Sequence, residues 1–379
     1  MTDKAKNMEV NAALADEEVE GLEEDSQQTG WGEDYPLDAV FVRNEYRTVS
    51  EVVKRVDAGR YQLDPDFQRD FVWPIDKQSR LIESCTMRIP LPVFYVAEKL
   101  DGGIAVVDGL QRLTTFHRFL NDGFELVLKA GEKQTHHPLD GMRFSDLPIQ
   151  LQERIEDTQL TLYILDAKAP ERAKLDIFER VNNGVPLTRQ QMRNCIFNGP
   201  ATNWLKKAAS SSEFLSASGR SLDKKTMRDR EAINRFCAFY LLGESSYTSA
   251  DMDDFLARAL KEMSKPSADL ELLSKRFKNS MQANRYLFGD HAFRKSLAYG
   301  FSYANRSVLN IALFDVCSVL FADASSSVVK ENEEYIKNAF YALLDDSDFV
   351  NAITYSTNST RQVAKRFEMA RAELKDYLL

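Results

Sequence analysis

The distribution of strand-like and helical segments along the chain constrains its fold more than any other sequence feature. From about Val40 to Ile164, short apolar runs rich in β-branched residues alternate with amphipathic helical segments. Downstream of residue 225, apolar residues recur almost only at helical spacing. This change near residue 220 predicts an α+β protein, in which a mixed α/β domain precedes an all-helical domain.

Cap and turn signals predict where the elements of the first domain lie. Thr48-Val49-Ser50-Glu51 forms a capping box before a helix that ends at Gly59. Further strands are expected at 61–63, 93–96, 104–107, 124–128 and 160–164, and further helices at 76–88, 110–121, 170–182 and 188–197. In the second domain, helices are expected at 230–242, 250–263, 270–284, 308–322, 331–344 and 359–378.

The N-terminal segment is strongly acidic. Residues 1–34 hold eleven acidic and two basic side chains, which account for the whole net charge of −9. Low hydrophobicity and like charge predict a disordered acidic tail over residues 1–36, followed by domains at 37–220 and 221–379. Such a tail could compete with nucleic acid for a basic groove, although solvation alone also explains its charge.

The sequence leads us to expect neither a membrane protein nor an exported one. No apolar run approaches the roughly 18 residues that a membrane span needs, and no signal peptide is visible. The cysteines Cys85, Cys195, Cys237 and Cys317 are far apart, so a Cys/His zinc site is not expected, and no residue is assigned as a metal ligand. Scattered thiols fit a reducing cytoplasm.

The sharpest chemical signal is the segment 106–112, Val-Val-Asp-Gly-Leu-Gln-Arg, in which a strand runs directly into a helix. Asp108 is placed to cap that helix, and Gly109 would let a ligand approach the backbone. The free N–H groups of a helix start suit a phosphate, and Arg112 offers a planar fork for its oxygens. An ordinary helix cap explains the Asp-Gly pair equally well.

Two other segments carry polar residues in loops. Residues 64–74 combine Gln68 and Arg69 with aromatic side chains, which alternatively belong to the core. Residues 178–184, Phe-Glu-Arg-Val-Asn-Asn-Gly, end a helix in a sequence that suits a left-handed cap and needs no further function.

Together these three segments resemble the GmrSD-type N-terminal domain, a prokaryotic family related to the ParB/sulfiredoxin fold. The resemblance covers about residues 40–230, and the order and spacing of the segments make it specific. The family recurs in restriction of modified or foreign DNA, and its Asp-Gly-Gln-Gln-Arg motif is associated with nucleotide binding and hydrolysis. This chain has Leu110 at the third position, whereas Asp108, Gly109, Gln111 and Arg112 match the motif.

The resemblance implies a nucleoside triphosphate as cofactor, with or without Mg²⁺. Asp108, Gln111 and Arg112 would be catalytic, with Gln111 orienting a water. The residues expected to contact the nucleotide or its phosphates are Gln68, Arg69, Gly109, Arg112, Arg180 and Asn182. Because Arg112 lies off the apolar stripe of its helix, we expect Arg112→Ala to abolish ligand binding while the fold survives.

A nuclease of the His-Asn-His type, which cleaving members of the family carry, is not expected. Such a nuclease needs clustered histidines for a metal, and the only histidine downstream of His137 is His291. We therefore expect a partner effector protein to act on DNA. Lys224, Lys225 and Arg228 offer a weak second candidate surface for nucleic acid, although such charge runs are usually solvated faces.

Two functions remain open. The first is a nucleotide-binding, NTP-hydrolysing sensor component of an antiviral restriction system. The second is a non-catalytic module that recognises DNA or a nucleotide and recruits or restrains a partner nuclease or toxin.

Overall fold

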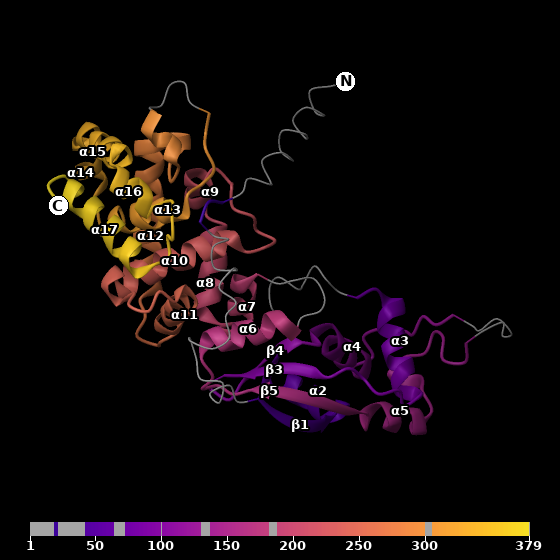
Figure 1. Cartoon of the computed structure of the whole chain (residues 1–379). Coiled ribbons are helices and arrows are strands. Elements are labelled where there is room, and N and C mark those ends of the chain that lie inside the picture. The colour runs from indigo at the N-terminus through magenta and orange to yellow at the C-terminus, as the bar shows by residue number, and fades with distance from the viewer. Residues whose placement is uncertain are drawn as a thin grey trace, which may run out of the picture. The chain divides into compact units, whose positions relative to one another are not determined.

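The structure, a computed structural model, describes residues 19–21, 42–63, 73–99, 101–129, 137–181, 188–299 and 305–378. Its backbone contacts divide the chain into two compact units (Figure 1). The α/β unit lies within residues 32–196, and the helical unit comprises residues 197–379 together with the described residues 19–21. A mixed α/β unit and a helical unit confirm the predicted α+β class.

The α/β unit is built on a five-stranded mixed sheet with the order β1-β5-β3-β4-β2. Its strands are β1 (Val42–Thr48), β2 (Tyr61–Gln62), β3 (Phe94–Glu98), β4 (Ile104–Asp108) and β5 (Gln159–Leu165). Its helices are α2 (Val49–Asp57), α3 (Ile75–Thr86), α4 (Leu110–Leu120), α5 (Ile149–Glu156), α6 (Glu171–Val181) and α7 (Arg189–Ile196). β1 pairs with β5, and β3 with β4, in antiparallel direction, whereas β3/β5 and β2/β4 are parallel.

The two faces of the sheet bury different residues. Ile104 and Val106 of β4 belong to a core cluster with buried residues of α2, α3, α4 and α5. Ala105 and Val107, which alternate with them, are also buried but lie outside that cluster. Helices α6 and α7 pack against β4 (Figure 1). The alternation along β4 therefore places helices on both sides of the sheet.

The local signals of this unit are mostly confirmed. Thr48 is the N-cap of α2, and its Oγ1 accepts a hydrogen bond from the Glu51 N–H at 3.2 Å. The strand expected at 124–128 is wrong, because this segment has no strand pairing. Its amides are satisfied individually instead: Leu126 donates to the Met142 carbonyl and Val127 donates to Ser79 Oγ.

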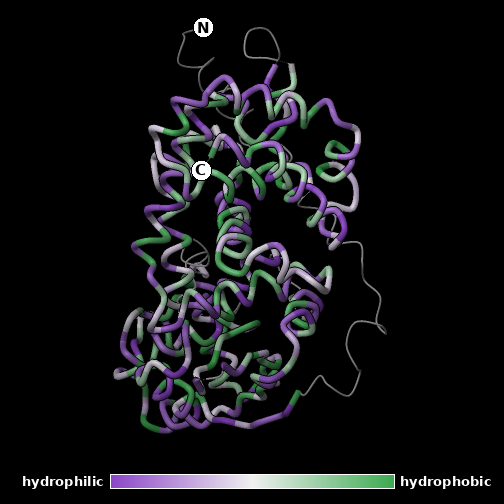
Figure 2. Tube along the Cα trace, turned by 90° about the vertical axis from the view of Figure 1, so that its left-hand side faces the viewer, coloured by the Kyte–Doolittle hydropathy of each residue, from purple (hydrophilic) through white to green (hydrophobic). Residues whose placement is uncertain are grey.

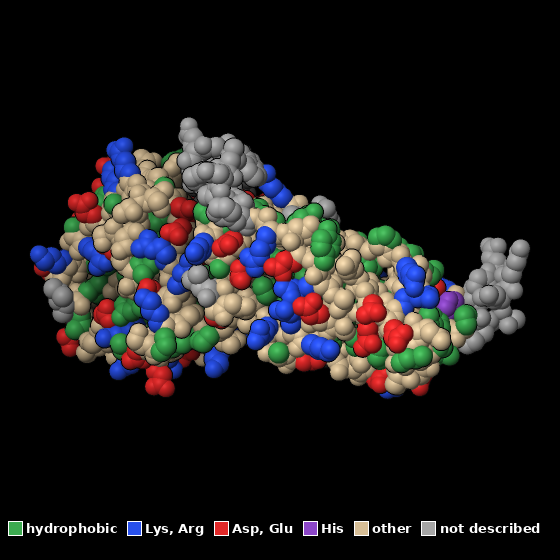
Figure 3. Space-filling model, turned by 90° about the horizontal axis from the view of Figure 1, so that it is seen from below, with side chains coloured by type: hydrophobic (Ala, Val, Ile, Leu, Met, Phe, Trp, Pro, Cys, Tyr) green, Lys and Arg blue, Asp and Glu red, His purple; other side chains and the backbone are tan. Residues whose placement is uncertain are grey.

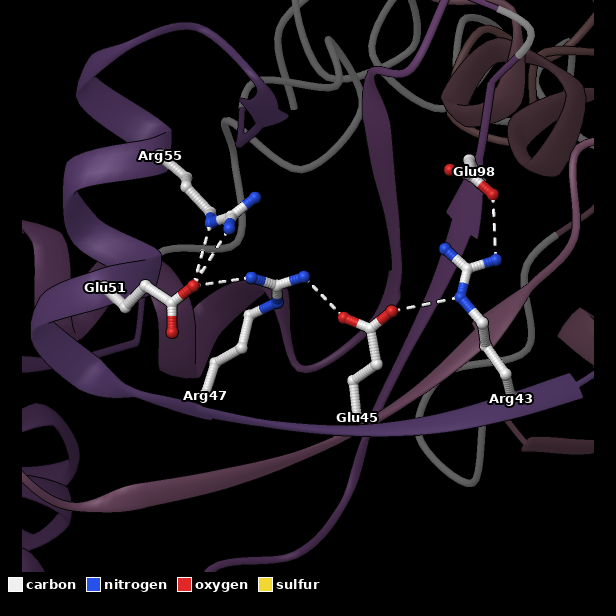
Figure 4. A network of polar contacts seen from close by, with 6 residues as sticks. All are labelled: Arg43, Glu45, Arg47, Glu51, Arg55 and Glu98. Atoms are coloured by element: carbon white, nitrogen blue, oxygen red, sulfur yellow. Dashed lines mark hydrogen bonds and ion pairs between the residues drawn. The ribbon is translucent and has the colours of Figure 1, made fainter.

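A continuous series of ion pairs runs along the edge strand β1 (Figure 4). Alternate residues of β1 are register partners of the core residues Leu160, Leu162 and Ile164, so their charged side chains share the core-facing side of the sheet. Paired charges at this position keep the edge from templating another strand. The ion pairs link Glu98, Arg43, Glu45, Arg47, Glu51 and Arg55 in that order.

The helical unit contains every long helix expected from the sequence. Along its helices, hydrophobic and hydrophilic residues follow one another on the trace (Figure 2), as in helices with one buried side. The helices are α8 (Pro200–Ala209), α9 (Ser212–Ala217), α10 (Arg228–Leu242), α11 (Met252–Met263), α12 (Leu270–Phe288), α13 (Ile311–Leu320), α14 (Ser326–Glu331), α15 (Glu333–Asp345), α16 (Ser347–Ala352) and α17 (Thr360–Leu374).

The units divide at residue 196, earlier in the chain than the expected domain boundary at residue 220. Helix α8 packs against α10 and α11, and α9 packs against α12, so both belong to the helical core. The composition of the chain changes after these helices, whereas the packing changes before them.

A buried carboxylate holds three helices of this unit together. Asp315 on α13 is fully buried and accepts hydrogen bonds from Arg235 on α10 and from Arg366 on α17. Burial lowers the pKa of Arg366 to about 10, although Asp315 opposes this shift, so the guanidinium stays charged at neutral pH. Breaking such a buried pair by removing one partner typically costs about 3–5 kcal/mol.

Three residues of the acidic N-terminal segment dock on the helical unit. Val19 is buried in the helical core, and the Glu20 backbone donates to the Leu309 carbonyl and accepts from the Ile311 N–H. The Glu20 carboxylate also pairs with Lys295. The expectation of disorder over residues 1–36 therefore does not hold for residues 19–21, and the rest of that segment lies outside the described residues.

We predict that Gly21→Val releases this docked segment. Gly21 has φ +92°, and a Cβ there would lie 2.8 Å from Ile311 Cγ2. Limited proteolysis should cleave the variant's N-terminal segment faster, and urea unfolding should show a loss of about 2 kcal/mol from the exposed Val19. Gly102→Val is the matched control, because Gly102 has φ +79° but open space around it. Equal protease sensitivity of Gly21→Val and the unmodified chain would contradict this prediction.

Candidate functional site

The candidate site begins where β4 ends and α4 starts. Gly109 is the N-cap of α4 in a left-handed conformation with φ 96° and ψ 9°, and no side chain caps the helix. The predicted capping role of Asp108 is therefore wrong. Its carboxylate instead accepts a hydrogen bond from Arg112 Nη2 at 2.9 Å, one turn further along the helix.

Gly109 is required by close packing as well as by its backbone conformation. A Cβ at this position would lie 2.3 Å from Cδ1 of Phe94, which is itself fully buried at the start of β3. Only a glycine lets α4 start this close to β3.

Arg112 is buried, with 8 % of its surface exposed. Its Nη1 donates to the Pro92 carbonyl, its Nη2 donates to the Val93 carbonyl at 3.1 Å, and its guanidinium lies 4.2 Å from the Phe94 ring centroid. Burial lowers the pKa of Arg112, while the charge and hydrogen bond of Asp108 oppose that shift. The expectation that Arg112 lies off the buried side of its helix is wrong, because the start of β3 packs over this turn of α4.

Gln111 contacts the end of the loop that contains Gln68 and Arg69. Its Oε1 accepts a hydrogen bond from the Trp73 N–H at 3.1 Å. At the other end of that loop, Gln62 is the register partner of Ala105 in β4. Gln68 and Arg69 lie outside the described residues, but one flank of their loop is attached to the first turn of α4 through Gln111, and the other pairs with the start of β4.

Two residues that sequence reasoning missed complete this attachment. Gln78 is buried and donates through Nε2 to the Trp73 carbonyl at 2.5 Å, and Arg118 donates to Gln78 Oε1 at 3.0 Å. The only sequence signal for Arg118 is its position two helical turns after Gln111 on α4. The backbone of Trp73 is thus held by hydrogen bonds at both its N–H and its carbonyl.

The remaining predicted nucleotide contacts lie near α6. Arg180 is an exposed residue in the last turn of α6, the helix that packs against β4. Asn182 lies outside the described residues.

The predicted basic surface belongs to the helical unit. Lys224 and Lys225 are exposed in the turn before α10, where the Asp223 carboxylate accepts from the Lys225 N–H, and Arg228 is the first residue of α10. On the face drawn in Figure 3, basic and acidic side chains are interspersed rather than gathered into one basic field.

Two further features of the described residues concern metal sites and membrane spans. Among those residues, no group of three or more His, Cys, Asp or Glu side chains is arranged to hold a metal ion. Within the same part of the chain, no helix has the length and apolarity needed to cross a bilayer.

At the β4–α4 junction, some groups are suited to bind an anion, whereas others hold neighbouring segments of the fold in place. The first turn of α4 presents backbone N–H groups without a side-chain cap, and the Asp108 side chain keeps 35 % of its surface exposed. The side chains of Gln111 and Arg112, in contrast, hold Trp73 and the segment before β3 in place.

We predict that Arg112→Ala lowers the free energy of unfolding by about 3 kcal/mol, because it leaves two carbonyls and Asp108 without their donor. Arg112→Lys should restore only part of this loss, since a lysine cannot bridge the same acceptors. Urea unfolding followed by circular dichroism measures both. Arg80→Ala, an exposed arginine on α3, is the control and should change stability by less than about 0.5 kcal/mol. Unchanged stability of Arg112→Ala would contradict a structural role for this residue.

The chain is similar to a known protein family. Residues 49–198 match the family model for the GmrSD restriction endonuclease, N-terminal domain, and no curated protein matches the chain. The match extends from α2 through α7 and includes Asp108, Gly109, Gln111 and Arg112. It confirms the resemblance found in the sequence, and residues 49–198 therefore form a domain of the GmrSD restriction endonuclease N-terminal family.

Proposed function

We propose that this protein is the nucleotide-binding, NTP-hydrolysing sensor component of a prokaryotic restriction system that acts on DNA together with a partner effector in the cytoplasm. Membership of residues 49–198 in a restriction endonuclease domain family supports a restriction-related role. Nucleotide binding and hydrolysis go beyond that match, and they rest on the β4–α4 junction.

One observation carries the proposal. A left-handed glycine opens α4 directly after a buried strand, and the first turn of the helix has no side-chain cap. Backbone N–H groups and the positive end of the helix dipole favour a phosphate at such a position. One flank of the Gln68–Arg69 loop is attached to this turn through Trp73 and Gln111, and the other flank pairs with β4 through Gln62.

Each residue of the site would then have its own role in binding or hydrolysis. The N–H groups after Gly109 bind phosphate oxygens, with Arg69, Gln68, Arg180 and Asn182 as further contacts. Asp108, the partly exposed carboxylate at the junction, helps to hold Mg²⁺ or to position the attacking water. Gln111 holds Trp73 rather than orienting a water, because its Oε1 already accepts the Trp73 N–H.

A second candidate function is a module that binds a nucleotide or DNA without turnover and controls a partner nuclease or toxin. The occupied donors of Arg112 favour it, since they bind the Pro92 and Val93 carbonyls and Asp108 rather than pointing outward. This geometry leaves fewer groups for transition-state stabilisation.

Phosphate release from each NTP in the presence of Mg²⁺ tests the first proposal. The full chain should release phosphate from at least one NTP, and Asp108→Asn should slow that release roughly 100-fold, because the variant keeps the size of the side chain but loses its charge. Arg80→Ala should be as active as the unmodified chain.

Binding without turnover would support the second candidate and overturn the first. No binding of any NTP, measured by equilibrium dialysis, would overturn nucleotide recognition in both.

A further inference from the structure

Part of one sheet face in the α/β unit carries exposed polar and aromatic side chains instead of a covering core. Tyr46 of β1 is the register partner of Thr161, and Asn44 is the register partner of Tyr163, both in β5. These residues alternate with Leu160, Leu162 and Ile164, whose side chains fill the core on the opposite face. The side chain of Tyr46 is 62 % exposed, and Asn44 is also exposed.

Two tyrosines on neighbouring strands form a stacked pair on this face. Tyr95 of β3 is the parallel register partner of Tyr163. Their ring centroids are 5.4 Å apart and the ring planes differ by 28°. Both residues are half-buried, so parts of the ring surfaces remain open to solvent. A cross-strand pair stabilises a sheet by itself, but it does not account for the exposed Tyr46 and Asn44 beside it.

The stacked pair of Tyr163 and Tyr95 lies next to the strand that ends at the candidate phosphate site. Tyr95 is the register partner of Asp108, at the point where the β3/β4 register shifts. The sequence of neighbours across the sheet is therefore Asn44, Tyr163, Tyr95 and Asp108. Adjacent strands lie about 4.8 Å apart, so two strand spacings separate the backbones of Tyr163 and Asp108, and three separate the strand of Tyr46 from β4. A nucleotide that reaches from these rings to the start of α4 would pass over the end of the sheet, where β4 ends.

A cavity of about 780 Å³, a size typical of small-molecule sites, lies at the end of the sheet where β5 begins, between α5 and residues 88–91. Thr161 and Gln159 line it with hydrogen-bonding groups. Its charged lining residues are two arginines, Arg88 and Arg154, and two acids, Glu153 and Asp157. This balance favours a neutral, hydrogen-bonding heterocycle over a chain of phosphates.

The cavity is also connected through the backbone to the β4–α4 junction. Residues 88–91 form one of its walls, and they lead directly into Pro92 and Val93, the two carbonyls that Arg112 binds. Arg112 thereby fixes this wall relative to Gly109 and the start of α4.

We propose that Tyr46, Tyr163 and Tyr95 together form the nucleobase subsite for the nucleotide whose phosphates bind at residues 109–112. The inference rests on the proposed nucleotide binding and names the surface that receives the base. Base stacking on aromatic rings is tolerant of sequence. Asn44 Nδ2 donates to the Tyr46 hydroxyl at 3.5 Å, which leaves the Asn44 Oδ1 and the Thr161 hydroxyl suited to hydrogen bonds with the edges of a base.

Comparison of each NTP with inorganic tripolyphosphate tests this subsite, because tripolyphosphate has no base. Isothermal titration calorimetry on the full chain should show that Tyr163→Ala and Tyr46→Ala each weaken NTP binding about tenfold, as expected for lost stacking. Both variants should bind tripolyphosphate like the unmodified chain. Tyr163→Phe should keep NTP affinity, since the ring remains. Tyr355→Ala, which removes a tyrosine 65 % exposed in the helical unit, is the matched control.

The outcomes separate this inference from the function it rests on. NTP binding that both tyrosine variants leave unchanged would overturn the subsite while nucleotide binding stands. Absence of binding for every NTP and for tripolyphosphate would overturn both. Equal losses of NTP and tripolyphosphate affinity would mark the tyrosines as supports of the fold, which also overturns the subsite. Because Tyr46 is exposed, Tyr46→Ala gives a result even if Tyr163→Ala does not fold.

Discussion

The guanidinium of Arg112 is the interaction on which the candidate site depends. It joins three parts of the chain: the end of β4 through Asp108, the segment before β3 through two carbonyls, and the first turn of α4 on which it lies. A buried guanidinium is tolerated only when acceptors satisfy its donors, so these parts are held in one arrangement. The close approach at Gly109, which leaves no room for a Cβ beside Phe94, depends on the same arrangement.

The site combines structural and ligand-directed features within a few residues. Gln111 and Arg112 use their side chains to fix neighbouring segments, whereas the backbone after Gly109 and the carboxylate of Asp108 remain the groups suited to a ligand. A motif of this kind can be retained for two reasons at once. Side-chain replacement then tests stability and binding together, which is why conservative variants and exposed-arginine controls are needed.

Local patterns in the sequence predicted the elements whose stabilisation is local. Helical spacing found α10 through α13, and Thr48 was identified as the cap of α2. The apolar residues at 124–128 gave the signal of a strand, but their amides bond to Ser79 and to residues 140–142. Alternation reports burial on one side and does not show which groups the backbone will pair with.

The residues that the sequence could not identify act across long separations. Gln78 contacts Arg118 over 40 positions, and the burial of Arg112 arises from a strand that precedes it in the chain. The spacing of apolar residues in α4 indicates which side of the helix is buried by its apolar side chains. It does not indicate that the Pro92 and Val93 carbonyls pack against Arg112. The docking of Val19 likewise depends on residues near 310, far from the acidic composition that predicted disorder.

Hydrogen–deuterium exchange on the full chain, with and without each NTP and Mg²⁺, tests the central claim most directly. If the β4–α4 junction binds the phosphates of a nucleotide, at least one NTP should slow exchange of the amides at 109–113 and in the segment that Arg112 holds before β3. Unchanged exchange at both places with every NTP, at concentrations where binding is otherwise measured, would contradict the account.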